Sequence, residues 1–462
     1  MTPPNIVICQ CDQLRAFNVG CYGDPLVNTP NMDRLAARGI RFENAITPNP
    51  VCTPARSAIL SGQFSRTCAG MLGNVHENPP NPRRERLKDP TLPECLKKRD
   101  YDTALIGKWH VDPQPQLVGF DKALYPKVAH RYYGQTVFDE HANAQVVEGF
   151  LEDFFAEHVR SYIEAPRENP FFLHYNISPP HQPIGPGHLP DKYVDMYDPE
   201  QIELRSNTRT DGETPHDPQF WYRVYRSADF FWDWLAKREP KPEDADLPDG
   251  FGLRELTALY YGAITCVDDY LGRLVDTLEA SGQLDRTIIV FCADHGDNLG
   301  SHGLFNKNSL IEEAIRVPLI VSGPGLAPAV QENVVNLVDV APTVLSLVGD
   351  RPAAPMQGEP VHALPQPVDP ERATFVETGH HVAVRTATHL YGLPYHEAKR
   401  SIADGGAVFH DLRSDPYELS NLAGTGEQGE RAAALRERLL AWDHSCPWMP
   451  RPANTREPEA RA

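Results

Sequence analysis

Short, continuous apolar runs alternate with helix-like segments along most of the chain, and this alternation restricts the fold most strongly. The runs are rich in β-branched and aromatic residues, which is typical of strands buried on both faces. They are NIVICQC (5–11), TALIG (103–107), FFLHYNI (171–177), TIIVFCA (287–293) and VPLIVSG (317–323). Between them, Thr29 and Pro30 begin a helix that closes near Gly39, and residues 256–282 form a long amphipathic helix. The pattern predicts an α/β fold, with a large, doubly wound, mostly parallel sheet sandwiched by helices.

The C-terminal part of the sequence has a different pattern. Residues 351–370 are rich in proline and show no periodicity, which is typical of a linker. Short strand-like runs and one helix-like segment follow, namely TFVETG, HVAVRT, GAVFHDL and GERAAALRERLLAWD. We therefore predict a large α/β domain over 1–360 and a smaller C-terminal α+β domain, a small antiparallel sheet plus a helix, over 361–448. Residues 449–462 are predicted to be a disordered tail.

The acidic balance of the chain restricts its partners. With 44 Lys and Arg against 63 Asp and Glu, the formal net charge is −19, which argues against nucleic acid or an anionic membrane as a partner. A small anionic substrate is compatible with this charge, because local cations decide binding within a Debye length. No run approaches the length of a membrane span, and no basic region precedes the first apolar run, so we expect no signal peptide. Nine cysteines without a CxxC pair favour reduced thiols in a cytoplasmic protein.

Potential metal ligands follow two of the predicted strands. Asp12 and Gln13 come directly after NIVICQC, and Asp294 and His295 directly after TIIVFCA. Either pair alone is more often a helix cap or a turn. Because ligands of open α/β sheets gather at the carboxyl ends of the strands, the two pairs together predict a site for one divalent cation.

Cationic side chains follow the other strands. Lys108 and His110 come after TALIG, His181 stands in a proline-flanked loop after FFLHYNI, and Lys307 lies beyond the second ligand pair. Each alone is usually a solvated or structural residue. Together with a metal at the same edge of the sheet, they would bind a tetrahedral oxyanion. The aromatic segment 218–234 is either core packing or part of the wall of a substrate pocket.

The stretch NPVCTPARSAILSG (49–62) places Cys52 close to Arg56 at the start of a helix-like run. A cation and helix N-terminal amides there favour a thiolate or an anionic ligand, although a buried structural cysteine would give the same pattern. Too few residues separate the cysteine from the arginine for the anion loop of cysteine phosphatases.

The segment CTPARSAILSG resembles the C-x-P-x-R signature of the formylglycine-dependent sulfatases. Further segments resemble the family in the same order over about residues 5–445, namely GKWH, PPHQP, ADHGDNLGSHG, VDVAPTVLSLVG and FHDLRSDPYELSNLAG. The resemblance implies an alkaline phosphatase-like fold. It also implies that a formylglycine-generating enzyme oxidises Cys52 to formylglycine during maturation.

The resemblance further implies a role for each candidate residue. The hydrate of formylglycine 52, activated by the metal and Arg56, would attack sulfur and displace the alcohol. His110 would then deprotonate the second hydroxyl so that sulfate leaves and the aldehyde is restored. Sulfate oxygens would be held by Lys108, Lys307 and His181, and either His181 or Lys307 would protonate the leaving oxygen. Asn74 in MLGNVHE corresponds to a substrate-contacting asparagine of some branches.

The implied metal ligands are Asp12, Gln13, Asp294, His295 and residue 52. Calcium is the metal expected first. Many members of the family have Asp-Asp and Asp-Asn at the two ligand pairs, where this chain has Asp-Gln and Asp-His. One carboxylate fewer and one imidazole more also admit manganese or magnesium.

The expected reaction is therefore hydrolysis of a small or saccharide-type sulfate ester. One alternative is a phosphonate monoester or phosphodiester hydrolase on the same scaffold, which the Asp-Gln pair favours and the pair Lys108 and His110 opposes. Another alternative is a non-catalytic binding protein in which Cys52 is never converted. A homo-oligomer is compatible with the sequence.

Overall fold

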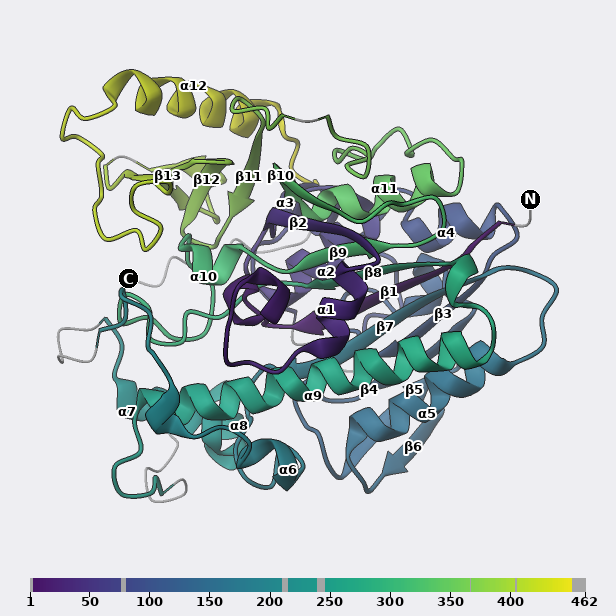
Figure 1. The fold of residues 1–462 in the computed structure, drawn as a ribbon. Helices are drawn as coiled ribbons and strands as arrows, with labels where there is room; N and C mark the ends of the chain where they lie inside the picture. Colours follow the sequence, from purple (N-terminus) through teal and green to yellow (C-terminus); the bar gives the residue numbers. More distant parts are fainter. Residues whose placement is uncertain are drawn as a thin grey trace.

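The protein is described by a computed structural model over residues 3–75, 80–209, 215–238, 246–365, 367–403 and 405–450. In this part of the chain a ten-stranded mixed sheet forms the centre (Figure 1), in the order β10-β2-β9-β8-β1-β7-β3-β4-β5-β6. Its strands are β1 (Asn5–Asp12), β2 (Gly39–Ile46), β3 (Asp102–Gly107), β4 (Lys122–Pro126), β5 (Gln135–Asp139), β6 (Ala144–Val147), β7 (Phe171–Pro180), β8 (Thr287–Ala293), β9 (Leu319–Ser322) and β10 (Ala329–Asn336).

Four of the predicted strands lie side by side and parallel at the centre of the sheet, in the order β8-β1-β7-β3. β1, β7 and β8 are buried along their whole length, as expected for apolar runs covered on both faces. The fifth predicted strand, β9, is antiparallel to β8, and β5 and β6 are antiparallel at the other edge. The α/β prediction is confirmed. The parallel centre brings the carboxyl ends of four strands to one edge.

Helices cover both faces of the sheet (Figure 1). The long helix α9 (Leu253–Ala280) packs on β7 beside α5 (Leu151–Glu164) and α1 (Pro30–Ala36). Behind the sheet in this view lie α2 (Cys52–Ser61), α4 (Leu92–Lys97) and α11 (Val340–Leu347), which contact one another. The other α-helices described before the C-terminal sheet are α3 (Ser65–Cys68), α6 (Asp191–Val194), α7 (Pro218–Arg226), α8 (Ala228–Leu235) and α10 (Glu312–Ile315).

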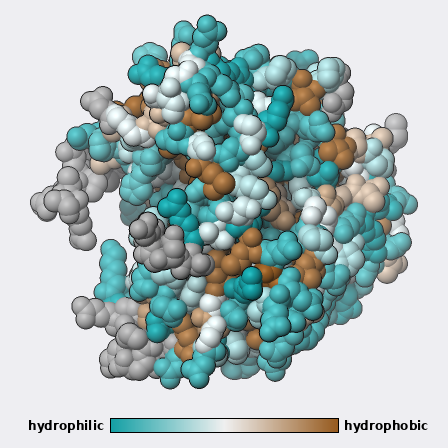
Figure 2. Space-filling model, turned by 60° about the vertical axis from the view of Figure 1, so that its left-hand side comes forward, coloured by the Kyte–Doolittle hydropathy of each residue, from teal (hydrophilic) through white to brown (hydrophobic). Residues whose placement is uncertain are grey.

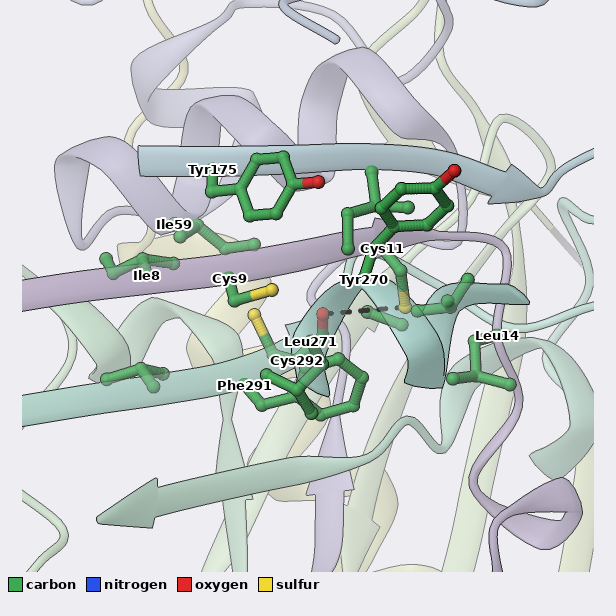
Figure 3. Packing of buried hydrophobic residues seen from close by; sticks show 14 of the residues in the cluster. Ile8, Cys9, Cys11, Leu14, Ile59, Tyr175, Tyr270, Leu271, Phe291 and Cys292 are labelled. Carbon is green, nitrogen blue, oxygen red and sulfur yellow. Dashed lines mark hydrogen bonds between the residues drawn. The ribbon is translucent and has the colours of Figure 1, made fainter. Parts of the chain in front are cut away.

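The core fills the space between the central strands and α9. In Figure 3, the thiols of Cys9, Cys11 and Cys292 lie among side chains that include Tyr270 and Leu271 of α9. All nine cysteines of the chain are free thiols, and most are buried. Among the described residues, no helix combines the length and the apolar character that crossing a bilayer requires.

A second, antiparallel sheet follows the predicted linker. It contains β11 (Ala373–Glu377), β12 (His381–Thr386), β13 (His389–His396), β14 (Ser401–Ile402) and β15 (Val408–Asp411). Helix α12 (Gly429–Ser445) packs on β12 and β13. The predicted small sheet with one helix is confirmed, whereas the domain boundary near residue 360 stays a prediction. Most of the predicted disordered tail, residues 451–462, lies outside the described residues.

Glu152, at the start of α5, has a buried carboxyl group with one unsatisfied oxygen. Its Oε1 accepts a hydrogen bond of 2.9 Å from the backbone N–H of Ser178, and its Oε2 has no hydrogen-bond partner among the described residues. Burial raises the pKa of Glu152 from its ordinary value of 4.5 to about 7. The folded protein therefore binds a proton in a pH range where the unfolded chain has released it.

The substitution Glu152→Gln should remove a pH-dependent loss of stability. The protonated carboxyl contributes stability that is fully present below about pH 4.5 and is lost as the pH rises through about 7, on the order of 3 kcal/mol in total. We expect the variant to be more stable than the wild type at about pH 8, and the difference to shrink at about pH 5. Urea denaturation at both pH values measures this. Glu157→Gln, on an exposed position of the same helix, is the control, and a difference that does not change with pH would contradict the prediction.

Candidate active site

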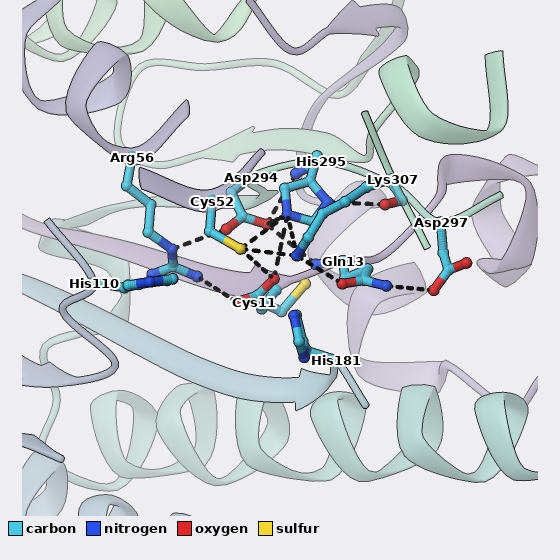
Figure 4. A network of polar contacts seen from close by, with 12 residues as sticks. Cys11, Gln13, Cys52, Arg56, His110, His181, Asp294, His295, Asp297 and Lys307 are labelled. Carbon is cyan, nitrogen blue, oxygen red and sulfur yellow. Dashed lines mark hydrogen bonds and ion pairs between the residues drawn. The ribbon is translucent and has the colours of Figure 1, made fainter. Parts of the chain in front are cut away.

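The predicted site residues meet at the carboxyl edge of the central strands. Asp12 is the last residue of β1, and the first residues after β3, β7 and β8 are Lys108, His181 and Asp294. Cys52 is the first residue of α2, whose N-terminus points at the same place. Figure 4 shows Asp294, His295 and Lys307 around the Cys52 sulfur, with His181 nearby.

Four side chains at this edge form a candidate metal site. The ligand atoms of Asp12, Cys52, Asp294 and His295 all lie within 4.8 Å of one another, and all four residues are buried. His295 Nε2 is 3.5 Å from an Asp12 oxygen and 3.6 Å from an Asp294 oxygen. Two carboxylates and an imidazole nitrogen are suitable ligands for a divalent cation. The residues therefore fit the metal that the sequence implies.

Neighbouring backbone groups orient two of these ligands. His295 Nδ1 lies 2.8 Å from the carbonyl oxygen of Gly296, to which it can donate only as an N–H, so Nε2 faces the site with its lone pair. A Cβ at Gly296 would lie 1.9 Å from the carbonyl oxygen of Glu313, so only glycine fits there. Asp294 Oδ1 accepts from the backbone N–H of His295 and of Gln13, at 2.9 and 3.1 Å.

Gln13 turns its amide oxygen toward the site. Its backbone has a φ of 67°, in the left-handed region, which residues with a Cβ rarely adopt. Its Nε2 donates to Asp297 Oδ2 at 2.5 Å, and a carboxylate can only accept. The orientation of the amide is thereby fixed, with Oε1 2.9 Å from Lys307 Nζ.

The Cys52 sulfur is fully buried and lies among cations. Lys307 Nζ is 2.9 Å away and Lys108 Nζ 3.9 Å away, with His295 Nε2 at 3.3 Å. Burial by itself raises the pKa of the Cys52 thiol, but the charges of these groups outweigh it and hold the pKa well below its ordinary value. The position of the sulfur is therefore one where an anionic atom is strongly stabilised.

Arg56, one turn along α2, connects this position to the two aspartates. Its Nε donates to Asp294 Oδ2 at 2.8 Å, and one terminal nitrogen lies 3.5 Å from Asp12 Oδ2. Its other terminal nitrogen donates to Asn176 Oδ1 and to the Lys108 carbonyl oxygen, both at 3.2 Å. The guanidinium is 1% exposed, so its charge is balanced by the aspartates rather than by water.

The two predicted catalytic histidines, His110 and His181, lie with Asn74 around the sulfur and the space beside it. His110 Nε2 is 3.1 Å from the Val75 carbonyl oxygen, and its buried Nδ1 makes no hydrogen bond of ordinary geometry. His181 Nδ1 donates to the Gln182 carbonyl oxygen at 2.7 Å. Asn74 Oδ1 accepts from the backbone N–H of Thr53 at 2.9 Å.

A cavity of about 360 Å³ opens beside these residues. Its floor contains Lys307 and the histidines, and one wall is made by aromatic side chains of α8. The aromatic lining residues are Trp109, Tyr125, Phe231, Trp232 and Trp234. Of the two alternatives for segment 218–234, the pocket wall is therefore correct for its α8 half. On the side of the molecule toward which the central strands point, apolar side chains gather among hydrophilic ones (Figure 2).

The structure brings together all the predicted site residues and adds three that sequence reasoning missed. Asn176 holds Arg56 and lies on the strand FFLHYNI, and Asp297 fixes Gln13 from within the segment ADHGDNLG. Both stand inside quoted motifs, so those motifs could have identified them. His130 lines the cavity from the loop between β4 and β5, where no motif marks it.

Buried acidic ligands, a helix N-terminus and several cations around one anionic position define a hydrolase site for esters of tetrahedral oxyanions on an α/β sheet. A family model described as Sulfatase matches residues 4–350, and one described as the C-terminal part of N-sulphoglucosamine sulphohydrolase matches residues 300–445. The chain belongs to the sulfatase family, and is thereby a sulfuric ester hydrolase.

Curated relatives match nearly the whole chain. An ulvan-active sulfatase of Formosa agariphila is 29% identical, over 95% of this chain and 81% of its own. An N-acetylglucosamine-6-O-sulfatase of Bacteroides thetaiotaomicron is 28% identical, over 94% and 85% of the two chains. A choline-sulfatase of Rhizobium meliloti is 29% identical, over 95% and 87%.

Solved structures share the fold. A protein in complex with its substrate D-glucosamine-2-N,6-O-disulfate has a TM-score of 0.78 at 24% identity, covering 96% of this chain and 98% of its own. A phosphonate monoester hydrolase from Silicibacter pomeroyi has a TM-score of 0.71 at 21% identity, covering 96% of both chains. Both likenesses concern the fold, and the alkaline phosphatase-like architecture predicted from the sequence is confirmed.

Proposed function

We propose that this sulfatase hydrolyses an organic sulfate monoester by means of a formylglycine at position 52. The observation that carries the proposal is the environment of the Cys52 sulfur, where Lys307 at 2.9 Å, Lys108 at 3.9 Å and the N-terminus of α2 favour negative charge. In the mature enzyme an oxygen of the hydrated aldehyde takes the place of the sulfur.

Each side chain then has a task that follows from its position. A divalent cation, held by Asp12, Gln13, Asp294, His295 and residue 52, supplies Lewis-acid polarisation when bound. Arg56 keeps the two carboxylates of this set in place.

Lys108 and Lys307 donate to the sulfate oxygens, where charge grows during S–O cleavage. His110, whose free Nδ1 faces the site, acts as the base for the second hydroxyl. His181 or Lys307 delivers the proton to the leaving oxygen.

The cavity suits the alcohol part of a saccharide-type ester. The faces of Trp232 and Trp234 can stack on the apolar face of a sugar ring. Trp232 Nε1 and Gln182 Nε2 are buried N–H donors without a partner among the described residues. Both belong to residues that line the cavity, so they can donate to hydroxyl or ring oxygens. Asn74 contributes an amide at the same wall.

The alternative is a phosphonate monoester or phosphodiester hydrolase. Gln13 in place of an aspartate and the fold likeness to a phosphonate monoester hydrolase favour it. We prefer the sulfatase assignment because the family model and the three curated relatives described above are sulfatases, and because Lys108 and His110 both reach the site.

Conversion of Cys52 can be measured directly. In protein made together with a formylglycine-generating enzyme, the peptide that contains residue 52 should be lighter than the cysteine form by about 18 Da, because CHO replaces CH₂SH. Peptide mass spectrometry measures this. Cys68, on the neighbouring α3, is the internal control and should keep its thiol. Full sulfatase activity from protein that contains only the Cys52 thiol would contradict the proposed nucleophile.

The metal site can be tested without an activity assay. Binding to the folded state alone stabilises it by about 2.7 kcal/mol at a hundredfold excess over Kd, so calcium or manganese should raise the Tm of the wild type. Asp294→Asn should lose the shift and the bound metal, which elemental analysis detects. Asp268→Asn, a buried carboxylate that caps α1, is the control. It should lower Tm and keep the metal response, and equal metal content in both variants would contradict the assignment.

Substrate preference separates the two reactions. Sulfate, phosphonate and phosphodiester substrates that share one aryl leaving group should be hydrolysed with kcat/KM highest for the sulfate. All three carry one negative charge, so the reason is the set Lys108, His110, His181 and Lys307, which matches the pattern that the resemblance to sulfatases implies. Steady-state kinetics on all three, with formylglycine content determined for the same preparation, measure this. If the phosphonate or the diester exceeds the sulfate by more than about tenfold, the alternative function replaces the proposed one.

A further inference from the structure

We infer that His130 is a positioning residue of the sulfate pocket, which holds Lys108 and His181 in the arrangement that the reaction requires. This inference rests on the proposed function of the same site. No sequence motif contains His130, which lies in the loop between β4 and β5. It is 6% exposed and lines the cavity.

The first observation is the contact between His130 and Lys108. The Nδ1 of His130 lies 3.3 Å from Lys108 Nζ. Because an ammonium group has only donors, the nitrogen that faces it must present its lone pair, and the ring proton is on Nε2. Burial and the neighbouring His181 and Lys108 hold the pKa of His130 well below its ordinary value, in agreement with a neutral ring that accepts.

The second observation is a close stack of two imidazoles. The ring centroids of His130 and His181 are 3.6 Å apart and their planes differ by 6°. Two further rings, those of His110 and Phe231, pack against His130 nearly at right angles. Their centroids are 5.5 and 5.9 Å from that of His130. His130 therefore lies between the two predicted catalytic histidines and the aromatic wall of α8.

These contacts determine the directions of two functional groups. Lys108 Nζ has three N–H bonds. One is directed to Asp12 and one to His130, so the third is left for the position of residue 52, where the sulfur is 3.9 Å away. His181 is held in its plane by the stack and along its edge by the bond of Nδ1 to the Gln182 carbonyl oxygen. Its Nε2 is thereby presented to the cavity.

Preorganisation of this kind acts on the transition state more than on substrate binding. A donor that is already aimed at the developing charge needs no reorganisation during the reaction. Without His130, Lys108 loses one of its two fixed partners and His181 loses the surface that fixes its ring. The sulfate would still bind to the same cations, but they would be less well aligned when the S–O bond breaks.

Three substitutions separate the two contacts. His130→Asn keeps an acceptor near the position of Nδ1 and loses the stack. His130→Phe keeps a ring to stack on His181 and loses the acceptor. His130→Ala loses both. His174→Phe is the matched control, because His174 is a buried histidine on β7 that packs beside Phe120 and Phe172 and does not line the cavity.

The expected result is a loss in kcat with little change in KM. For an aryl sulfate, His130→Ala should lower kcat by about 10- to 100-fold while KM changes by less than about threefold. His130→Asn should make the rate more sensitive to the pKa of the leaving phenol than in the wild type, as judged from phenyl and nitrophenyl sulfates. His130→Phe should lower all rates in the same proportion. The control should lower Tm without lowering kcat.

A second measurement does not depend on turnover. Inorganic sulfate should raise the Tm of the wild type, and in His130→Ala this rise should be smaller only to the extent of a Kd weakened by less than about threefold, in line with the small change in KM. An inactive wild type in which sulfate still raises Tm and His130→Ala reduces the rise would count against the proposed function and support this inference. The inference is wrong if His130→Ala has wild-type kcat and a wild-type response to sulfate. It is also wrong if all three variants lose the same activity with unchanged leaving-group dependence, because His130 would then only fill space.

Discussion

The ion pairs of Arg56 with Asp12 and Asp294 are the constraint on which the site depends. The two carboxylates come from adjacent parallel strands and are buried, so each would repel the other without a cation between them. Arg56 supplies that cation from one turn along α2. The same side chain therefore links both carboxylates to α2, and with it to the position of residue 52.

Around these ion pairs, the site combines charged groups with apolar aromatic side chains. Lys307 lines the cavity next to the buried metal-ligand set, and α8 contributes aromatic side chains to the lining. The chain has a net charge of −19, yet the surroundings of the Cys52 sulfur favour an anion. Local geometry thus outweighs overall charge, since groups within a few ångströms interact far more strongly than screened surface charges.

The sequence predicts the fold and most of the site because the relevant residues are tied to strand ends. Parallel strands all have their carboxyl ends at the same edge of a sheet. The order of residues along the chain is therefore enough to assign four residues to that edge, namely Asp12, Lys108, His181 and Asp294. His130 could not be assigned in this way. It reaches the cavity from a loop, and a loop's path is set by packing against distant segments such as α8.

The orientation of individual side chains could not be predicted from the sequence either. Whether Gln13 turns its oxygen or its nitrogen to the site depends on Asp297, which lies far along the chain. Lys108 and His110 stand at alternate positions, which in an extended strand would place their side chains on the same side. His110, however, has a φ of 47° and has left the extended conformation. Its ring reaches the cavity by a turn of the backbone rather than by strand periodicity.

The burial of Cys52 sets a limit on the order of events in the life of the protein. The residue is 0% exposed and lies behind Lys307, which lines a cavity whose walls come from segments spread over much of the chain. A maturation enzyme of protein size cannot reach a side chain in that position. In the proposed function, conversion of Cys52 to formylglycine would therefore take place while α2 is still an unfolded stretch of chain. The yield of active enzyme would then depend on the rate of Cys52 oxidation relative to the rate of folding. A variant that folds faster could be more stable and yet less active.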